Sequence, residues 1–369
     1  MLILKPALRK VHNIFGCEPQ IPIFRLSLSV NIATHVAMIL DVARHKFYEG
    51  FFTLAIMTIV MIATFIFSSE GVALTTMPDT PFMALVASLT GGVAFVEKLA
   101  ATVLYMASAL MLARSAIRTH IYTADTMAPL ALSAVVMLPL ILVGNALNQS
   151  VVILLLAIAL GNMFYCFGPH RCLNHLFAAM VAAGTLAISV PAFALITLGI
   201  GIALILARKS LREATVTVTG MLLPMFVQCY VLWLMGDSFT DAVAELWHSM
   251  VEPWSADLVS RITTLIELPI PRLVFLAIVI IMQLTSVVLY LTEHDVHSPM
   301  VRGAWRAMLF IWIVALATTL LSVMPLWLPF TIVAVLSAVM LPMFFIRSNA
   351  LVSTLVYLLL IASSIAAIF

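Results

Sequence analysis

The chain has 369 residues, of which 64% are hydrophobic and only 9% are charged, and its mean hydropathy is +1.18. These values lie far above what the core of a water-soluble protein requires, and they exclude an ordinary soluble domain. The net charge of +2 comes without a cluster of cations on one face, which argues against nucleic acid as a partner. The composition predicts an all-α protein, a polytopic transmembrane helical bundle in contact with membrane lipids.

Eleven segments are long and apolar enough to cross a bilayer. In chain order they are residues 51–67, 94–113, 128–143, 151–167, 174–190, 192–207, 215–235, 273–291, 307–323, 328–346 and 351–369. A 17-residue helix covers roughly 25 Å, near the lower limit for a hydrocarbon core of about 30 Å. Because lipid offers no partner to unpaired backbone groups, and because no period-two alternation predicts a barrel, we expect these segments to be helices.

The distribution of cations predicts the orientation of this bundle. With the N-terminus inside, every Lys and Arg except Lys98, Arg261 and Arg272 falls in a segment facing the cytoplasm. This bias predicts a multi-pass protein with a cytoplasmic N-terminus and an extracytoplasmic C-terminus.

Four regions follow from this layout. Residues 1–50 form a cytoplasmic N-terminal segment, 51–235 a seven-span membrane module, 236–272 an extracytoplasmic loop, and 273–369 a four-span membrane module. In the first region, polar residues from Ser27 to His45 recur mostly at spacings of three, four and seven, which predicts an amphipathic helix. We expect it to lie in the cytoplasmic interface; the alternative, a twelfth span, would invert every later segment.

The extracytoplasmic loop is predicted to hold two interfacial helices. Phe239, Val243 and Trp247 share one helical face, and a second apolar face begins after Pro253. Trp247 and Trp254 are expected to anchor these helices at headgroup level.

Small residues and prolines predict details of helix packing. Gly184, Gly199 and Ser364 mark expected sites of close helix approach. Pro139 and Pro224 lie inside spans, where a kink is expected and a neighbouring helix can satisfy the freed carbonyl.

The candidate site residues all lie at the predicted outer face. No Asp, Glu, Lys or Arg occupies the middle of a span, so no proton- or ion-coupled pathway is predicted. Outside, Glu70 and Asp79 are candidate catalytic residues, because a carboxylate can take a proton from an acceptor hydroxyl. Lys98, Arg261 and Arg272 are candidate substrate-binding residues for a lipid phosphate. The alternative is that these cations reach phospholipid headgroups and the acids only solvate loops.

The layout resembles that of the GT-C glycosyltransferases. Members of this superfamily start inside, carry an acidic residue in the first exterior loop, and place a long exterior loop with interfacial helices after the seventh span. Glu70 and Asp79, and then residues 236–272, occupy these places here, although Ser68-Ser69-Glu70-Gly71 departs from the usual paired acidic motif. The resemblance implies transfer of a sugar from a polyprenyl-phosphate carrier at the outer face.

A second resemblance is to uncharacterised polytopic inner-membrane proteins of Bacteroidota. It lies in the stretch from Asn174 to Phe177, in the apolar pair of spans around Pro191, and in Ala207-Arg208-Lys209-Ser210-Leu211-Arg212 leading to Gly220 and Pro224. It implies an origin in the bacterial envelope and lends no activity.

Two further functions stay open: a non-catalytic scaffold or assembly subunit with membrane-protein partners, and an uncoupled transporter. No cofactor and no metal are predicted. Cys166, His170, Cys172 and His175 contain the residue types that bind zinc, but their spacing fits no standard zinc site, and a turn that meets headgroups is the favoured interpretation. For the second cluster, Glu293 to His297, a salt-bridged loop is favoured over a metal or proton sensor.

Overall fold

The computed structural model describes the chain from residue 47 onward, apart from short gaps. The described ranges are 47–67, 80–91, 93–122, 126–143, 145–168, 172–208, 210–254, 258–292 and 297–368. All of them belong to one compact unit, Asp41–Phe369. The amphipathic segment expected between Ser27 and His45 lies outside the described residues, and so do Glu70 and Asp79.

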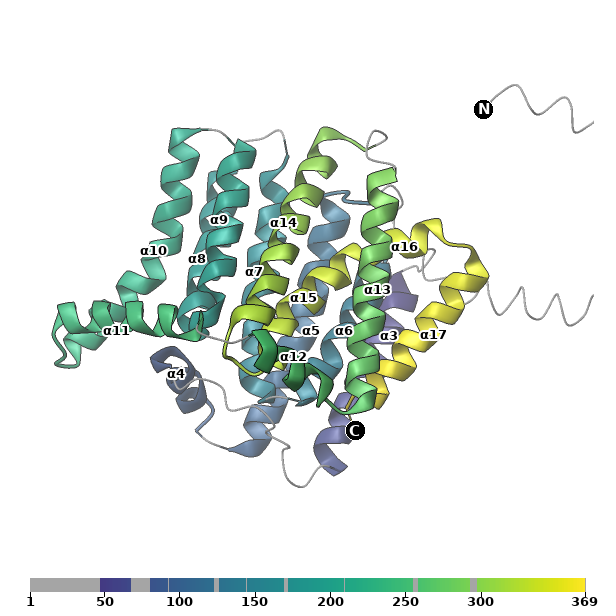
Figure 1. The fold of residues 1–369 in the computed structure, drawn as a ribbon, viewed down its shortest axis with the longest axis horizontal. Helices are drawn as coiled ribbons and strands as arrows, with labels where there is room; N and C mark the ends of the chain where they lie inside the picture. Colours follow the sequence, from purple (N-terminus) through teal and green to yellow (C-terminus); the bar gives the residue numbers. More distant parts are fainter. Residues whose placement is uncertain are drawn as a thin grey trace, which may run out of the picture. The chain divides into compact units, whose positions relative to one another are not determined.

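The described residues form helices and contain no strand (Figure 1). In chain order the elements are α3 (Phe47–Phe67), α4 (Pro81–Leu89), α5 (Ala94–Arg118), α6 (Ala128–Val143), α7 (Ala146–Cys166), α8 (Leu173–Ser189), η2 (Pro191–Phe193), α9 (Ala194–Arg208), α10 (Leu211–Leu234), α11 (Phe239–Val251), η3 (Glu252–Trp254), α12 (Leu258–Ile266), α13 (Ile270–Thr292), α14 (Pro299–Leu321), α15 (Trp327–Met340), α16 (Pro342–Arg347) and α17 (Ala350–Ala366). The predicted all-α class is confirmed for this part of the chain.

Within the described ranges, six helices are both long and apolar enough to cross a membrane. They are Ala94–Arg118, Ala146–Cys166, Leu211–Leu234, Ile270–Thr292, Pro299–Leu321 and Trp327–Arg347, the last formed by α15 and α16 together. Shorter apolar helices are Gly50–Ile66, Ala128–Val143, Leu173–Ser189, Pro191–Ala207 and Ala350–Ala366. Each segment predicted as a span lies on one of these helices, so the helices support a membrane protein.

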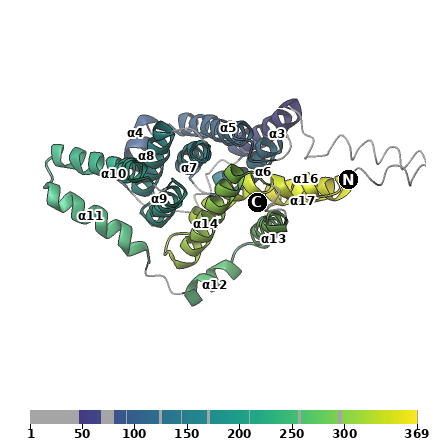
Figure 2. The same cartoon turned by 90° about the horizontal axis from the view of Figure 1, so that it is seen from above.

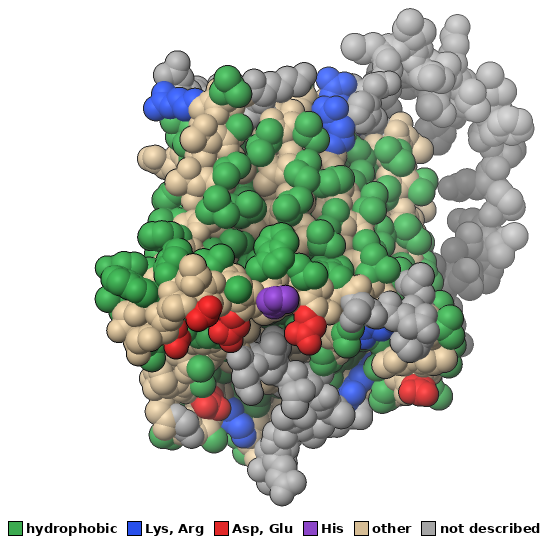
Figure 3. Space-filling view, turned by 60° about the vertical axis from the view of Figure 1, so that its left-hand side comes forward, with side chains coloured by type: hydrophobic (Ala, Val, Ile, Leu, Met, Phe, Trp, Pro, Cys, Tyr) green, Lys and Arg blue, Asp and Glu red, His purple; other side chains and the backbone are tan. Residues whose placement is uncertain are grey.

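The bundle has two chemically different ends. At one end, which is uppermost in Figure 1, α9 connects to α10 and α13 connects to α14; at the other lie α11 and α12. We call the first the basic end; its charged residues include Arg114, Arg118, Arg212, Arg302, Arg306 and Arg347, and one carboxylate, Glu213, in the first turn of α10. We call the second the acidic end; its carboxylates include Glu97, Asp237, Asp241, Glu245, Glu252 and Glu267. On the face drawn in Figure 3, Asp and Glu lie only in the lower half, whereas Lys and Arg lie both at the top and in the lower half.

Two short helices, α6 and α15, form the centre of the unit. Every residue of α15 is buried, and every residue of α6 except Leu142 is buried. The two helices pack against each other, and α3, α5, α7, α13, α14, α16 and α17 surround them. Figure 2 shows α8, α9 and α10 on one side of this centre. A helix enclosed by others is apolar all round, which explains why these two segments show no polar face.

Helix α6 contains a proline whose effect is compensated by its neighbours. Pro139 has no N–H to donate to the carbonyl of Val135, four residues earlier. The Ser364 hydroxyl of α17 donates to that carbonyl oxygen at 2.7 Å, and the Tyr105 hydroxyl of α5 donates to the adjacent carbonyl, that of Ala134, at 2.8 Å. A neighbouring helix thus satisfies the carbonyl that the proline frees, as expected.

Helices α8 and α10 pack through glycine. A β-carbon on Gly184 would collide with the main-chain oxygen of Met221. A β-carbon on Gly220 would lie 3.0 Å from the Met180 β-carbon and 3.1 Å from the main-chain oxygen of Phe177. Because neither position carries a side chain, the two backbones can approach closely.

The acidic end contains the short helices that the sequence predicts there. α11 and α12 are the two amphipathic helices expected in the loop after α10, and η2 forms the turn expected at Pro191. α4 is a short helix that ends at Thr90 and Gly91, where the chain takes a positive φ of 63°. Glycine adopts this conformation without the steric cost that a β-carbon would bring.

Candidate functional site

All three cations predicted to bind substrate lie at the acidic end, and each donates to the main chain. Lys98, in the first turns of α5, donates from Nζ to the main-chain oxygen of Phe65 at 2.8 Å. The same ammonium lies 5.7 Å from the centre of the Phe65 ring. Phe65 is in the last turn of α3, where helix carbonyls lack intrahelical partners and carry partial negative charge. Lys98 therefore stabilises the C-terminus of α3.

Arg272 has the same role for α17, the last helix of the chain. It lies in the first turn of α13, is 9% exposed, and donates from Nε to the main-chain oxygen of Ala367 at 3.3 Å. Ala367 is the residue that ends α17. A buried guanidinium thus satisfies a helix carbonyl that has lost its intrahelical partner.

Arg261 connects α12 to the turn between α14 and α15. Its Nη2 donates to the Ser322 hydroxyl at 3.3 Å and to the main-chain oxygen of Met324. The same turn is also held by η3, because the N–H of Val323 donates to the main-chain oxygen of Pro253 at 2.8 Å. The loop between α10 and α13 is therefore fastened to the helical bundle by side-chain and main-chain hydrogen bonds.

The charge of Arg261 is not balanced within the described part of the chain. The residue is only 6% exposed, and its Nε has no hydrogen-bond partner there. No described carboxylate forms an ion pair with it, and burial lowers the pKa of its guanidinium below the ordinary value. A guanidinium stays protonated at neutral pH, so a buried positive charge with an unused donor lies at this end. Such a charge is costly unless an anion pairs with it.

An apolar cavity lies under α12, the helix that carries Arg261. Its volume is about 160 Å³, and Leu265 of α12, Leu276 of α13 and Leu316 of α14 are among the residues that line it. Leu265 is one helical turn after Arg261, on the same face of α12. α13 packs against α15, α16 and α17 but not closely against α14, and α12 lies across this gap (Figure 2). A cavity of this size holds a small apolar group, since a dry cavity of about 150 Å³ binds benzene.

The described acids at this end do not converge on the cations. Glu97 accepts a hydrogen bond from the Thr90 hydroxyl at 3.4 Å, and Asp241 and Glu245 are exposed on α11. The predicted catalytic residues Glu70 and Asp79 lie outside the described residues, so their proximity to Arg261 stays a prediction.

The histidine and cysteine clusters have other partners. In the described ranges no group of three or more His, Cys, Asp or Glu could hold a metal ion. His175 stacks on Tyr165, and its Nδ1 lies 2.9 Å from the Asn162 side-chain oxygen. His297 stacks against Tyr290, which in turn stacks on Trp305 with ring centres 4.6 Å apart. His170, Glu293 and His294 lie outside the described residues.

Two buried amides were not singled out from the sequence. The Gln149 side-chain oxygen of α7 accepts a hydrogen bond from the Thr331 hydroxyl of α15 at 3.3 Å. Gln283 of α13 donates to the sulfur of Met340 at 2.9 Å. Both amides are fully buried. Their presence as polar residues inside apolar segments was the sequence feature that could have identified them.

Comparisons with protein-family models, curated proteins and solved structures find no match to this chain. The fold and the site define its class, an α-helical membrane protein whose acidic end contains a buried arginine, Arg261, without a described counter-charge, and an apolar cavity lined in part by the same helix. The resemblances to GT-C glycosyltransferases and to Bacteroidota membrane proteins stay predictions.

Proposed function

We propose that this is an eleven-span protein of the bacterial inner membrane that handles a lipid-linked sugar at its acidic end. The five shorter apolar helices then span the membrane together with the six longer ones. The basic end faces the cytoplasm, because arginines collect there, and the C-terminus is outside. The reaction is transfer of the sugar from a polyprenyl-phosphate carrier, as in the GT-C glycosyltransferases.

The observation that carries this proposal is the buried guanidinium of Arg261 on α12, one helical turn before Leu265, which lines the apolar cavity. A lipid phosphate has both properties that this pair of features would accept: an anionic group for the unused Nε donor and a hydrocarbon chain for the cavity. Arg has five N–H donors, so its hydrogen bonds to Ser322 and Met324 do not exhaust its capacity.

In the proposed reaction, the carboxylate of Glu70 or Asp79 takes the proton of an acceptor hydroxyl. The acceptor oxygen forms a bond to the anomeric carbon of the sugar, and the bond from that carbon to the carrier phosphate breaks. The phosphate leaves with the bonding electron pair, and Arg261 stabilises its negative charge, together with Lys98 and Arg272.

Variants of the full chain test this proposal in cells that lack the native protein. We expect Arg261→Gln, and at least one of Glu70→Gln and Asp79→Asn, to deplete the glycan product and to accumulate its lipid-linked precursor. Arg118→Gln, which alters an exposed arginine at the basic end, is the control and is expected to leave both unchanged. If lipid-linked intermediates and glycans are normal in all of these variants, the proposal is wrong.

One observation favours a second candidate, a scaffold without catalysis. Lys98, Arg261 and Arg272 all donate to main-chain oxygens, which is a sufficient structural use for each. A scaffold is expected to co-purify stoichiometric membrane-protein partners in mild detergent, and Arg261→Gln is then expected to leave lipid-linked sugars unchanged. Purification of the chain without partners would exclude this candidate.

A further inference from the structure

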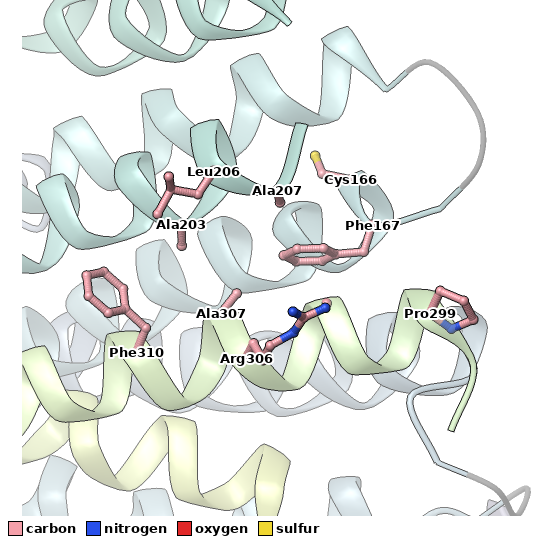
Figure 4. Close-up of a pocket in the computed structure, with 10 residues that line it drawn as sticks. Cys166, Phe167, Ala203, Leu206, Ala207, Pro299, Arg306, Ala307 and Phe310 are labelled. Atoms are coloured by element: carbon pink, nitrogen blue, oxygen red, sulfur yellow. The ribbon is translucent and has the colours of Figure 1, made fainter. Parts of the chain in front are cut away.

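A second hollow lies at the basic end, between α9 and α14 (Figure 4). It is a groove of about 570 Å³. Ala203 and Ala207 of α9 face Gly303 and Ala307 of α14 across it. The ring of Phe167, at the end of α7, closes the groove at one side, and a β-carbon on Gly303 would lie 3.0 Å from that ring. The groove exists because the facing residues are small.

The dimensions of the groove match one leaflet of a bilayer. Its lining on α14 runs from Pro299 to Phe310, which is roughly 17 Å of helix. The whole hydrocarbon core is about 30 Å thick, so this length is close to the depth of a single leaflet. Deeper in the bundle the two helices close together, where a β-carbon on Gly199 would meet Val314 at 3.5 Å. The groove therefore closes toward the centre of the bundle, and we call it the slot.

Among the described residues that line the slot, one, Arg306, is charged and the others are apolar. Arg306 is exposed, and Figure 4 shows its guanidinium beside Phe167, directed toward the end of the slot where Pro299 lies. Its Nε donates to the main-chain oxygen of Arg302 at 3.2 Å. No carboxylate in the described ranges forms an ion pair with Arg306 or Arg302. Within the described residues, the outer N–H groups of Arg306 therefore have no anionic partner.

The start of α14 adds to the positive potential at the same place. Ser298 precedes the helix and accepts a hydrogen bond from the N–H of Val301 at 3.4 Å. The first N–H groups of a helix carry partial positive charge, which favours an anion near Pro299. Arg306 and the helix N-terminus together give the mouth of the slot a charge complementary to phosphate.

We propose that this slot binds one anionic phospholipid from the leaflet at the basic end, with an acyl chain between α9 and α14 and the headgroup phosphate on Arg306. An apolar groove one leaflet deep with a guanidinium at its mouth matches a lipid, whereas a soluble phosphate would leave the apolar walls unfilled. The site lies at the opposite end from Arg261, so the failure of one proposal leaves the other standing.

Native mass spectrometry of the full chain in detergent tests this site, with phosphatidylglycerol and phosphatidylcholine of identical chains as probes. We expect one phosphatidylglycerol to bind more tightly than phosphatidylcholine. Arg306→Gln is expected to weaken phosphatidylglycerol about tenfold, the effect of losing one charge-assisted hydrogen bond, and to weaken phosphatidylcholine less, because the choline cation already offsets its phosphate charge. Inorganic phosphate in large excess is expected not to displace the lipid.

Two matched pairs of variants separate the slot from the rest of the surface. Ala207→Phe fills the slot from an exposed position and is expected to abolish the tight site, whereas Ala107→Phe on an exposed face of α5 is expected to have no effect. Arg118→Gln is the matched control for Arg306→Gln. Equal binding of the two lipids, displacement by phosphate, or normal phosphatidylglycerol binding by Arg306→Gln would overturn the proposal. Thermal unfolding of each variant confirms that it is folded.

Discussion

Ser364 and Pro139 are coupled through one carbonyl oxygen, that of Val135. The proline removes the helical donor to this oxygen, and the Ser364 hydroxyl replaces it at 2.7 Å. The neighbouring Ser363 donates instead to Leu360 of its own helix. The two serines thus form a natural comparison between an interhelical and an intrahelical hydrogen bond.

We expect Ser364→Ala to lower the free energy of unfolding by about 1 to 3 kcal/mol, because a buried carbonyl loses its partner. Ser363→Ala is expected to cost clearly less. Thermal unfolding in detergent measures both, and equal effects would contradict the prediction. Pro139→Ala supplies the missing N–H. In a chain that carries this substitution, Ser364→Ala is expected to lower the free energy of unfolding by less, and a double-mutant cycle measures the difference.

Arg272 is expected to contribute to stability whether or not it also binds a phosphate. Arg272→Ala removes a charged hydrogen bond to the last carbonyl of α17, and we expect a loss of about 1.5 to 3 kcal/mol. Lys98→Ala is the comparison. Lys98 is more exposed, so its interaction with α3 is screened and its loss is expected to cost less. Chemical denaturation in detergent measures both, and an Arg272→Ala protein as stable as the parent would contradict the prediction.

Gly184 and Gly199 lie at two helix contacts of different closeness. A β-carbon on Gly184 of α8 would meet the backbone of α10, which cannot move without shifting the helix. A β-carbon on Gly199 of α9 would meet only side-chain carbons of Val314, at 3.5 to 3.7 Å, which is ordinary van der Waals contact. We therefore expect a glycine-to-alanine change to affect stability differently at the two positions.

We expect Gly184→Ala to destabilise the protein by about 1 to 3 kcal/mol through overpacking. Gly199→Ala is expected to be neutral or stabilising by up to about 1 kcal/mol, because alanine has the higher helix propensity. Thermal unfolding of both variants checks the contrast. A stable Gly184→Ala protein would mean that α8 and α10 are not in the described contact.

Two helices begin well before the membrane spans that the sequence predicts on them. α7 begins at Ala146, five residues before the predicted span, and Asn145 accepts a hydrogen bond from the N–H of Asn148 as its N-cap. α14 begins at Pro299, eight residues before the predicted span, after the cap Ser298. In both cases polar residues at the start of the helix lower the local hydropathy, so the predicted span begins later than the helix. Hydropathy indicates which part of a helix is apolar, whereas the capping residue marks where the helix starts.

For the whole molecule, the separation of charge between the two ends predicts which end is cytoplasmic. We expect a cysteine at position 240 (Thr240→Cys), at the start of α11, to react with a membrane-impermeant maleimide in intact cells. A cysteine replacing the exposed Arg118 at the basic end is expected to react only after permeabilisation. Both substitutions are made in a chain without its four native cysteines. The reverse pattern would invert the orientation and remove the proposed reaction from the outer face.

The helical membrane character, the position of each apolar helix and the separation of charge were determined by the sequence alone. Lipid imposes these requirements on each segment separately, because every span must be apolar and satisfy its own backbone whatever its neighbours are. The partners of the predicted site residues were decided only by the tertiary structure. Arg272 meets Ala367 and Arg261 meets Met324, 95 and 63 residues away, and the two cavities form where distant helices diverge. No local pattern encodes such contacts, because they depend on how the helices pack against one another.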